Sequence, residues 1–312
     1  MNTNTVKKHN KQIVTVAVIT YHSAATVLET LDSIVNQTYG PENIELIISD
    51  DGSKDNTVQV INDWLAQYKI KFNDVKFFAN EVNGGISKNC NIVWKAATSE
   101  WIKTIAGDDL LTINALDDLV AFICKQEGID CVFGLVKKFP IDDAKLYPTK
   151  DSYGEKFFNL DAKKQFEALL IGNVPHAPAS FISKKSLKSI GYADLQFKNL
   201  DDYPLWLKLT SSGYKLYLMK CLVVKYRVSE SISLSFKNAI NINLNNEVRR
   251  CVVKYSLLTG PIKKYLIFVD VKMSYFNNLI ILHIFKNRKS FFTKALKIMS
   301  PLGLLRRLRL FI

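Results

Sequence analysis

Cysteine pairs are missing from this 312-residue sequence, and its five cysteines lie far apart with no Cys-x-x-Cys motif. The basic start of the chain, 1–11, is also not followed by an apolar stretch of the kind a signal peptidase uses. An odd, scattered set of cysteines without an export signal is typical of a reducing compartment, where thiols stay free. The sequence therefore predicts a cytoplasmic protein with buried thiols.

Long apolar runs are missing too. A membrane-spanning helix needs about 18 or more consecutive apolar residues. The nearest candidate, 265–285, is interrupted by Asp270, Lys272, Asn277 and Asn278. The sequence therefore predicts no transmembrane helix.

Acidic residues are scarce at one end of the chain. Segment 261–312 holds eleven Lys and Arg but a single acid, Asp270, so it carries +10 of the formal net charge of +13. The nearly neutral remainder argues against a protein whose whole surface binds nucleic acid. A basic end on a neutral body instead predicts contact with an anionic partner, such as a phospholipid surface.

A glycine-rich dinucleotide-binding turn is also missing. Gly-x-Gly-x-x-Gly would follow the first strand, but Thr20, Tyr21, His22 and Ser23 occupy that place. This disfavours a nicotinamide-dependent oxidoreductase.

Apolar runs alternate with helical patterns along the first half of the chain. The runs predict strands, and the segments between them have apolar residues at helical spacing, with Ser23 as the expected cap of the first helix. Strands are expected at 13–20, 44–48, 75–78, 101–106 and 131–136, and helices from about 23, from 57, at 86–97 and at 116–124. Such alternation predicts an α/β fold with a mostly parallel sheet and helices on both faces.

Polar side chains follow three of these strands where each strand ends. Tyr21, Asp51 and the pair Asp108–Asp109 all come directly after an apolar run. Because ligands of such sheets bind outside the carboxyl ends of the strands, we expect these residues in one crevice. Two adjacent acids at a buried strand end repel each other, so the pair predicts a divalent cation, Mn²⁺ or Mg²⁺.

The pattern changes after residue 138. A polar loop is expected at 138–156, then a helix near Phe166, a short strand at 179–183, a turn Asp201-Asp202-Tyr203 that opens a helix, and a strand at 214–226. From 241 the pattern is helical and basic. We expect a nucleotide-binding half at 1–138, an acceptor-binding half of the same domain at 139–240, and a helical, basic C-terminal extension at 241–312.

Five motifs in order resemble a known family. They are the run at 14–57 with DDGS, NGGISKNCN at 83–91, GDD at 107–109, LDDYPLWLKL at 200–209 and YRVSESIS at 226–233. Together they resemble the family 2 glycosyltransferases of bacterial surface-polysaccharide biosynthesis, which have a Rossmann-like GT-A fold. The resemblance covers roughly the first 235 residues.

On the donor side, the resemblance implies that Tyr21 stacks on the nucleotide base and Asp51 reads the base edge. It implies that Asp108 contacts the ribose and that Asp109 holds the cation. Lys88 is a candidate phosphate contact, because Cys90 stands where the family often has arginine. Ser229 stands where many members have a histidine, which leaves the third metal ligand open.

On the acceptor side, the resemblance implies that Asp202 is the catalytic base, with Asp201 in place of the usual glutamate. Tyr203 and Trp206 are the expected acceptor platform. One base suffices for an inverting transfer, because the diphosphate leaves without a proton from the protein.

The sequence thus predicts an inverting transfer from a nucleotide-sugar, with UDP as the expected nucleotide, to a saccharide or lipid-linked saccharide. The alternative is a non-catalytic or other nucleotide-binding α/β protein, in which Asp51 and Asp202 serve as turn and helix-opening residues.

Two interpretations of the last residues also stay open. Leu304, Leu305, Leu308 and Ile312 fall at helical spacing, with Arg306, Arg307 and Arg309 mostly elsewhere on the wheel. Such a helix can lie on the inner face of the cell membrane, which would make the protein peripheral there. It can equally pack its leucines on the catalytic domain.

Overall fold

A computed structural model describes residues 11–139, 146–147, 153–228 and 238–303. Within these ranges the strands are β1 Val14–Thr20, β2 Ile44–Asp50, β3 Asp74–Ala79, β4 Trp101–Ala106, β5 Leu110–Leu111, β6 Cys131–Phe139, β7 Leu146–Tyr147, β8 Ser180–Ser183 and β9 Leu216–Arg227. The α-helices are α1 Val27–Val35, α2 Thr57–Tyr68, α3 Ile86–Ala96, α4 Ala115–Cys124, α5 Tyr153–Asn159, α6 Ala162–Ile171, α7 Lys184–Ser189, α8 Asp202–Ser211, α9 Ile242–Ser256, α10 Pro261–His283 and α11 Phe291–Leu296.

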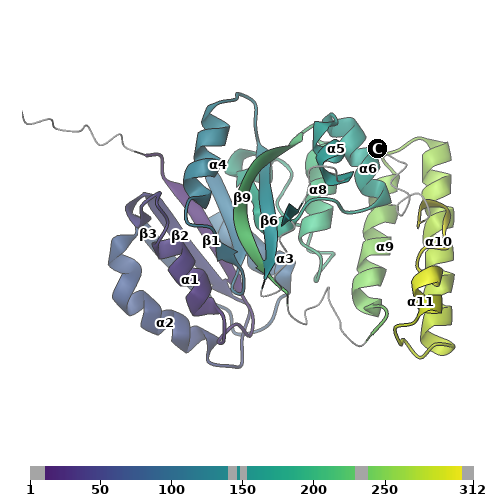
Figure 1. Cartoon of the computed structure of the whole chain (residues 1–312), viewed down its shortest axis with the longest axis horizontal. Helices are drawn as coiled ribbons and strands as arrows, with labels where there is room; N and C mark the ends of the chain where they lie inside the picture. The colour runs from purple at the N-terminus through teal and green to yellow at the C-terminus, as the bar shows by residue number, and fades with distance from the viewer. Residues whose placement is uncertain (1–10, 140–145, 148–152, 229–237, 304–312) are drawn as a thin grey trace, which may run out of the picture.

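All of these strands belong to one sheet in the order β3-β2-β1-β4-β8-β6-β9-β5, with β7 paired to β6 (Figure 1). The first four strands are parallel, as predicted. The second half is mixed, because β8 runs antiparallel to both β4 and β6, while β6 and β9 are parallel. Strands from both predicted halves therefore share one sheet.

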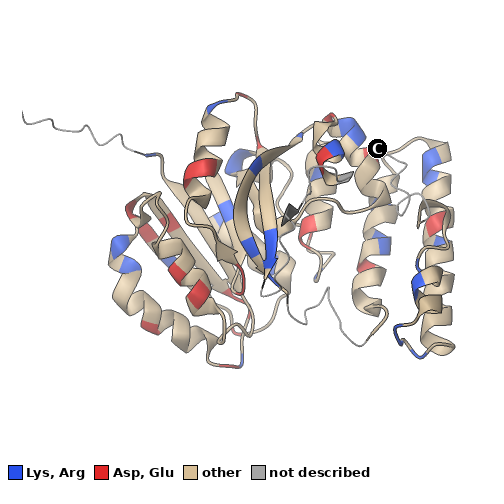
Figure 2. Cartoon of the chain, viewed as in Figure 1, with Lys and Arg blue, Asp and Glu red and all other residues tan. Residues whose placement is uncertain are grey.

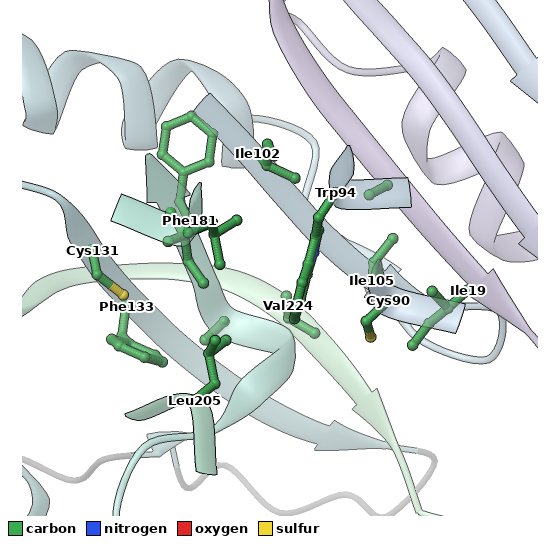
Figure 3. Packing of buried hydrophobic residues seen from close by; sticks show 14 of the residues in the cluster. Ile19, Cys90, Trp94, Ile102, Ile105, Cys131, Phe133, Phe181, Leu205 and Val224 are labelled. Carbon is green, nitrogen blue, oxygen red and sulfur yellow. The ribbon is translucent and has the colours of Figure 1, made fainter. Parts of the chain in front are cut away.

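Strands β1 and β2 are buried along their whole length, which explains why their sequences are rich in Val and Ile. Every residue of β1 and β2 is buried. Figure 3 shows Ile19 at the end of β1, Cys90 and Trp94 of α3, and Ile105 of β4 together in the core. This packing fixes the strand ends from which the site is built.

Two local predictions differ from the structure. Helix α1 begins at Val27 after the N-cap Thr26, and Ser23 contributes its carbonyl oxygen to the Val27 N–H rather than a side-chain cap. The segment predicted to be a loop at 138–156 contains β7 and the start of α5. Short elements of this kind lack a long apolar period, so the sequence did not indicate them.

The C-terminal helices stand together at one end of the molecule, with α9 between the body and α10–α11 (Figure 1). Contrary to the sequence prediction, α10 is long and apolar enough to cross a membrane by length and composition alone. The prediction counted unbroken apolar residues, whereas a helix of 23 residues tolerates a few polar positions on one face.

Candidate active site

Three neighbouring parallel strands end at one large cavity of about 1480 Å³. Tyr21 follows β1, Asp51 follows β2 and the pair Asp108–Asp109 follows β4, and all four residues line it. The predicted crevice at the strand ends is thus present. Its volume exceeds the ~300–1,000 Å³ of a pocket for one small ligand, so it has room for two substrates.

Asp51 holds the loop that carries the NGG motif. Its buried carboxylate accepts the backbone N–H groups of Gly84 at 2.8 Å and Gly85 at 2.9 Å. Gly85 has φ +89°, and a Cβ there would lie 2.5 Å from the carbonyl oxygen of Lys198. Glycine is therefore required, and Asp51 shapes the cavity wall.

Arg227, at the end of β9, holds the Asp108–Asp109 turn. Its backbone N–H donates to Oδ1 of Asp109 at 2.9 Å, and its Nε donates to the carbonyl oxygen of Asp108 at 2.9 Å. Its Nη2 also forms an ion pair with Glu29 at 2.8 Å. The two acids are thus held at the cavity edge by a residue 118 positions later in the chain.

The electrostatics of this turn favour a bound cation. Burial, and then the neighbouring Asp108 carboxylate, raise the pKa of Asp109 to about 8. The buried side chain of Lys103 lies on β4, and burial lowers its pKa to about 7, an effect that Asp109 opposes. A hard divalent ion relieves such carboxylate repulsion and prefers oxygen ligands. Among the described residues no group of three or more His, Cys, Asp and Glu side chains is arranged to hold a metal ion.

Asp201 and Asp202 line the same cavity from the start of α8. Oδ2 of Asp202 accepts the Asn173 amide at 3.0 Å, and Oδ1 accepts the Tyr203 N–H at 2.6 Å. The thiol of Cys90 lies 3.6 Å from Oδ2 of Asp201. Burial, followed by the Asp202 charge, raises the pKa of Asp201 to about 7, and burial also raises the pKa of Asp202.

The two aromatic residues of this motif point into the protein. Tyr203 and Trp206 are only 3% and 1% exposed. The Tyr203 hydroxyl donates to the carbonyl oxygen of Leu169, and Trp206 packs edge-to-face on Phe133. Both residues nevertheless line the cavity, as buried parts of its wall. Contact between this wall and an acceptor remains a prediction.

Comparison with known proteins places the chain in a family. Residues 15–191 match the model of Glycosyl transferase family 2. The chain belongs to this family. It is therefore a glycosyltransferase, which decides against the oxidoreductase and binding-module alternatives.

Curated relatives include the Minor teichoic acid biosynthesis protein GgaB of Bacillus subtilis, which is 29% identical over 70% of this chain and 23% of GgaB. The Putative glycosyltransferase EpsE of B. subtilis is 24% identical over 73% of this chain and 77% of EpsE. The UDP-Glc:alpha-D-GlcNAc-diphosphoundecaprenol beta-1,3-glucosyltransferase WfaP of Escherichia coli is 24% identical over 81% of this chain and 95% of WfaP. The chain thus spans about a quarter of GgaB.

Solved structures confirm the GT-A fold. S. aureus TarS 1–349 in complex with UDP-GlcNAc superposes with a TM-score of 0.64 at 19% identity, over 92% of this chain and 79% of TarS 1–349. The mannosyltransferase PcManGT of Pyrobaculum calidifontis, in complex with GDP-Man and Mn²⁺, gives 0.58 at 14% identity, over 97% and 85% of the two chains.

The remaining candidate residues of this glycosyltransferase differ in whether they line the cavity. Tyr21 lines the cavity, is 47% exposed and stacks on His22 with ring centroids 4.1 Å apart. Lys88 is exposed on α3 and does not line the cavity. Ser229 lies outside the described residues.

Sequence reasoning missed Lys103 and Asn173. A lysine inside the apolar run at 101–106 was a signal, because a lysine in a buried strand needs a specific environment. Asn173 gave no signal, since its partner Asp202 is 29 residues away. The contact of Arg227 with Asp109 gave no signal either, since the two residues are 118 positions apart.

Proposed function

We propose that this glycosyltransferase transfers a sugar from a UDP-sugar to a hydroxyl of a saccharide or lipid-linked saccharide, with inversion, in surface-polysaccharide biosynthesis. The observation that carries the proposal is the joint lining of one cavity by the Asp108–Asp109 turn and the Asp201–Asp202 pair. A UDP-sugar as the donor is supported by two relatives: TarS was solved in complex with UDP-GlcNAc, and the name of WfaP contains UDP-Glc. The saccharide–lipid acceptor is supported by the diphosphoundecaprenol in that same name.

The donor end of the proposed site comprises Tyr21, Asp51 and Asp108, with Asp109 as the cation ligand. The cation, Mn²⁺ or Mg²⁺, would neutralise charge on the departing diphosphate. Diphosphate oxygens and water would complete its shell, because the described residues supply few ligands. Lys88 stays a weaker candidate, since reaching the phosphates would require its exposed side chain to move.

At the acceptor end, Asp202 is the proposed general base. Its carboxylate accepts the proton of the acceptor hydroxyl as that oxygen attacks the anomeric carbon. The Asn173 amide fixes one carboxylate oxygen, and the raised pKa of Asp202 increases its basicity. Asp201, which accepts a hydrogen bond from the Cys90 thiol, is proposed to contact the acceptor beside it.

A donor panel tests the proposal. The protein is incubated with Mn²⁺ and individual nucleotide sugars, and released nucleoside diphosphate is measured with and without a saccharide acceptor mixture. UDP and Mn²⁺ together should raise the melting temperature more than either alone. A lack of joint stabilisation by any nucleoside diphosphate would contradict the proposed donor site.

We also propose that the C-terminal region binds an anionic membrane surface from the cytoplasmic side, and that α10 makes the contact. Three polar residues of this helix, Asp270, Asn277 and Asn278, are buried. Asp270 accepts the Leu302 N–H at 2.8 Å, and the Asn277 amide donates to the carbonyl oxygens of Leu296 and Met299. Acid and amide groups are buried while large apolar side chains are exposed, which is the reverse of the usual pattern of a surface helix. This indicates that an apolar phase, here the membrane, covers the outer face.

The outer face of α10 combines apolar and basic residues. Ile262, Tyr265 and Phe276 are 76%, 66% and 63% exposed. Lysines and arginines recur along α10 and the turn into α11, which Figure 2 shows in blue. Charge of this sign favours an anionic leaflet over a second copy of the same basic helix. Because the inner polar face is engaged with α11 and Leu302, the helix would lie on the membrane rather than cross it.

A further inference from the structure

The cavity does not end at Asp202 but continues into a groove between α9 and α10. The groove is lined by Leu244, Val248 and Val252 of α9 and by Val271, Ser274 and Asn278 of α10. Glu247 of α9 joins this helix to the acceptor end, since its carboxylate accepts the backbone N–H of Asn199 at 2.9 Å and the Asn199 amide at 3.1 Å. Asn199 is two residues before Asp201, so α9 and the acceptor end form one wall.

Arg249 lines this groove and lacks a counter-ion within the described residues. Its Nη2 donates to Oδ1 of Asn246 at 2.5 Å, and its guanidinium lies 5.2 Å from the centre of the Tyr275 ring. Its Nη1 is buried without a hydrogen-bond partner, and no carboxylate of the described part of the chain lies within 4.0 Å.

A half-buried cation in this state is unfavourable. Burial lowers the pKa of Arg249, and Asp270, the acid of α10 that also lines the cavity, accepts the backbone N–H of Leu302. The Tyr275 ring offsets only part of the desolvation cost. The free-energy cost of an unsatisfied donor that lines a cavity is removed when a ligand accepts a hydrogen bond from it.

Phosphate is the acceptor that suits this donor. A guanidinium presents a planar fork that matches phosphate oxygens, whereas the neighbouring Asn245, Ser274 and Asn278 are neutral. The diphosphate of the donor belongs to the Asp108–Asp109 turn in the proposed function, so an anion at Arg249 must come from the other substrate. We propose that Arg249 binds a phosphate group of the acceptor. This inference rests on the proposed glycosyl transfer and names the chemistry of its second substrate.

Such a phosphate has two sources, a prenyl diphosphate or a polyol phosphate, and two probes separate them. Wild type, Arg249→Gln and Arg250→Gln are titrated with farnesyl diphosphate and with glycerol 3-phosphate by calorimetry, after UDP and Mn²⁺ have filled the donor end. Arg250 is the matched control, because it is the next residue of α9, is exposed and does not line the cavity. Farnesol serves as the probe without phosphate.

We expect Arg249→Gln to weaken binding of at least one phosphate probe about tenfold or more, the scale of a lost charged hydrogen bond. Arg250→Gln should bind as wild type does, and farnesol should not distinguish the variants. Whichever probe responds identifies the source of the phosphate. Equal binding of both phosphate probes by the two variants would overturn the proposal.

Folding and the donor end are controlled separately. Arg249→Lys keeps the charge but not the fork, so its affinity should fall between wild type and Arg249→Gln, with an unchanged melting temperature. The preceding titration with UDP and Mn²⁺ measures the donor site alone. If the wild type does not bind UDP, the proposed function is contradicted. If the wild type binds UDP but its binding of the phosphate probes does not depend on Arg249, only this inference is contradicted.

Discussion

At the scale of single residues, the two acidic clusters of the cavity differ in their surroundings. Asp109 is buried beside another acid and receives one backbone N–H, from Arg227. Asp202 receives a side-chain amide and a backbone N–H. The environment of Asp109 favours a bound cation, whereas that of Asp202 orients its carboxylate. The two acids therefore have different proposed roles.

We expect Asp109→Ala to abolish the Mn²⁺ dependence of UDP binding, because the substitution removes the proposed cation ligand. It also removes the acceptor of the Arg227 N–H, so the melting temperature of the variant is measured alongside. Calorimetry with UDP, with and without Mn²⁺, measures this. Asp63→Ala, which removes an exposed acid of α2, is the control. Unchanged metal-dependent affinity in Asp109→Ala would refute the assignment.

Asp202→Asn should keep UDP affinity and lower turnover by roughly 10² or more, the usual scale of acid–base catalysis. The amide is nearly isosteric with the carboxylate but cannot accept the proton. Nucleoside diphosphate release at saturating donor and acceptor is the measurement. A fall of less than about tenfold would move the base to Asp201, and Asp201→Asn measured in parallel decides between them.

Glu45 is a buried acid outside the cavity, and its role is stability. Burial would raise its pKa, but hydrogen bonds from Lys76, Thr15 and Thr98 outweigh that effect and lower it to about 2, from an ordinary value of 4.5. The contribution of Glu45 to the free energy of unfolding is thus complete above pH 4.5 and lost as the pH falls toward 2.

Wild type should therefore lose about 2–3 kcal/mol of stability through Glu45 across that pH window. Glu45→Gln should be less stable at neutral pH and lose less on acidification. Urea unfolding at several pH values between neutrality and the acid limit measures both slopes. Parallel slopes for the two proteins would contradict the prediction.

At the scale of elements, the loop before α3 joins β2 to the second half of the chain. The N–H of Gly85 donates to Asp51. The α-carbon of Gly85 lies so close to Lys198 that an added Cβ would be 2.5 Å from the Lys198 carbonyl oxygen. The position of this loop, and with it that of Asp51 at the proposed donor end, therefore depends on the segment before α8.

Gly85→Ala should destabilise the fold by about 2–3 kcal/mol and weaken UDP binding, because it combines positive φ with a clash. Gly128→Ala is the matched control, since Gly128 has φ +76° with no atom within 4 Å of its added Cβ. That substitution should cost about 1 kcal/mol and leave UDP affinity unchanged. Thermal unfolding and calorimetry test both. Equal effects of the two substitutions would show that the contact with Lys198 is unimportant.

At the scale of the whole molecule, the donor end, the acceptor end and the groove of Arg249 form one cavity that runs from the sheet to the C-terminal helices. The proposed membrane face is the outer side of those same helices. A lipid-linked acceptor would then reach the cavity from the surface that α10 covers.

We expect the protein to co-sediment with vesicles that contain phosphatidylglycerol and only weakly with pure phosphatidylcholine. Lys264→Gln with Lys272→Gln should weaken binding by about 1 kcal/mol per charge. Phe268→Ser with Phe276→Ser should also weaken it, because both rings are exposed on α10. Ile70→Ser, which removes an 88% exposed side chain from the body, is the control.

Sedimentation without lipid addresses the competing interpretation. If the α10 substitutions abolish a dimer and leave vesicle binding unchanged, the apolar face is an interface between copies. The predicted amphipathic segment from Leu304 to Ile312 lies outside the described residues, so its part in membrane binding stays a prediction.

The sequence by itself determined the order of the long elements in the first half of the chain and the residues of the proposed donor end. Apolar runs and helical spacing are local properties, and the residues that follow parallel strands necessarily meet at one edge of a sheet. The order of the strands along the chain is therefore sufficient to bring Tyr21, Asp51 and Asp109 together.

Only the tertiary structure decided which residues hold those groups in place and which faces are exposed. Arg227 reaches Asp109, Asn173 reaches Asp202, and β8 enters the sheet antiparallel, all through contacts between distant segments. The burial of Trp206 and the outward apolar face of α10 likewise depend on what each helix packs against. Hydrophobic periodicity fixes the type of an element, whereas its orientation follows from the packing of the whole chain.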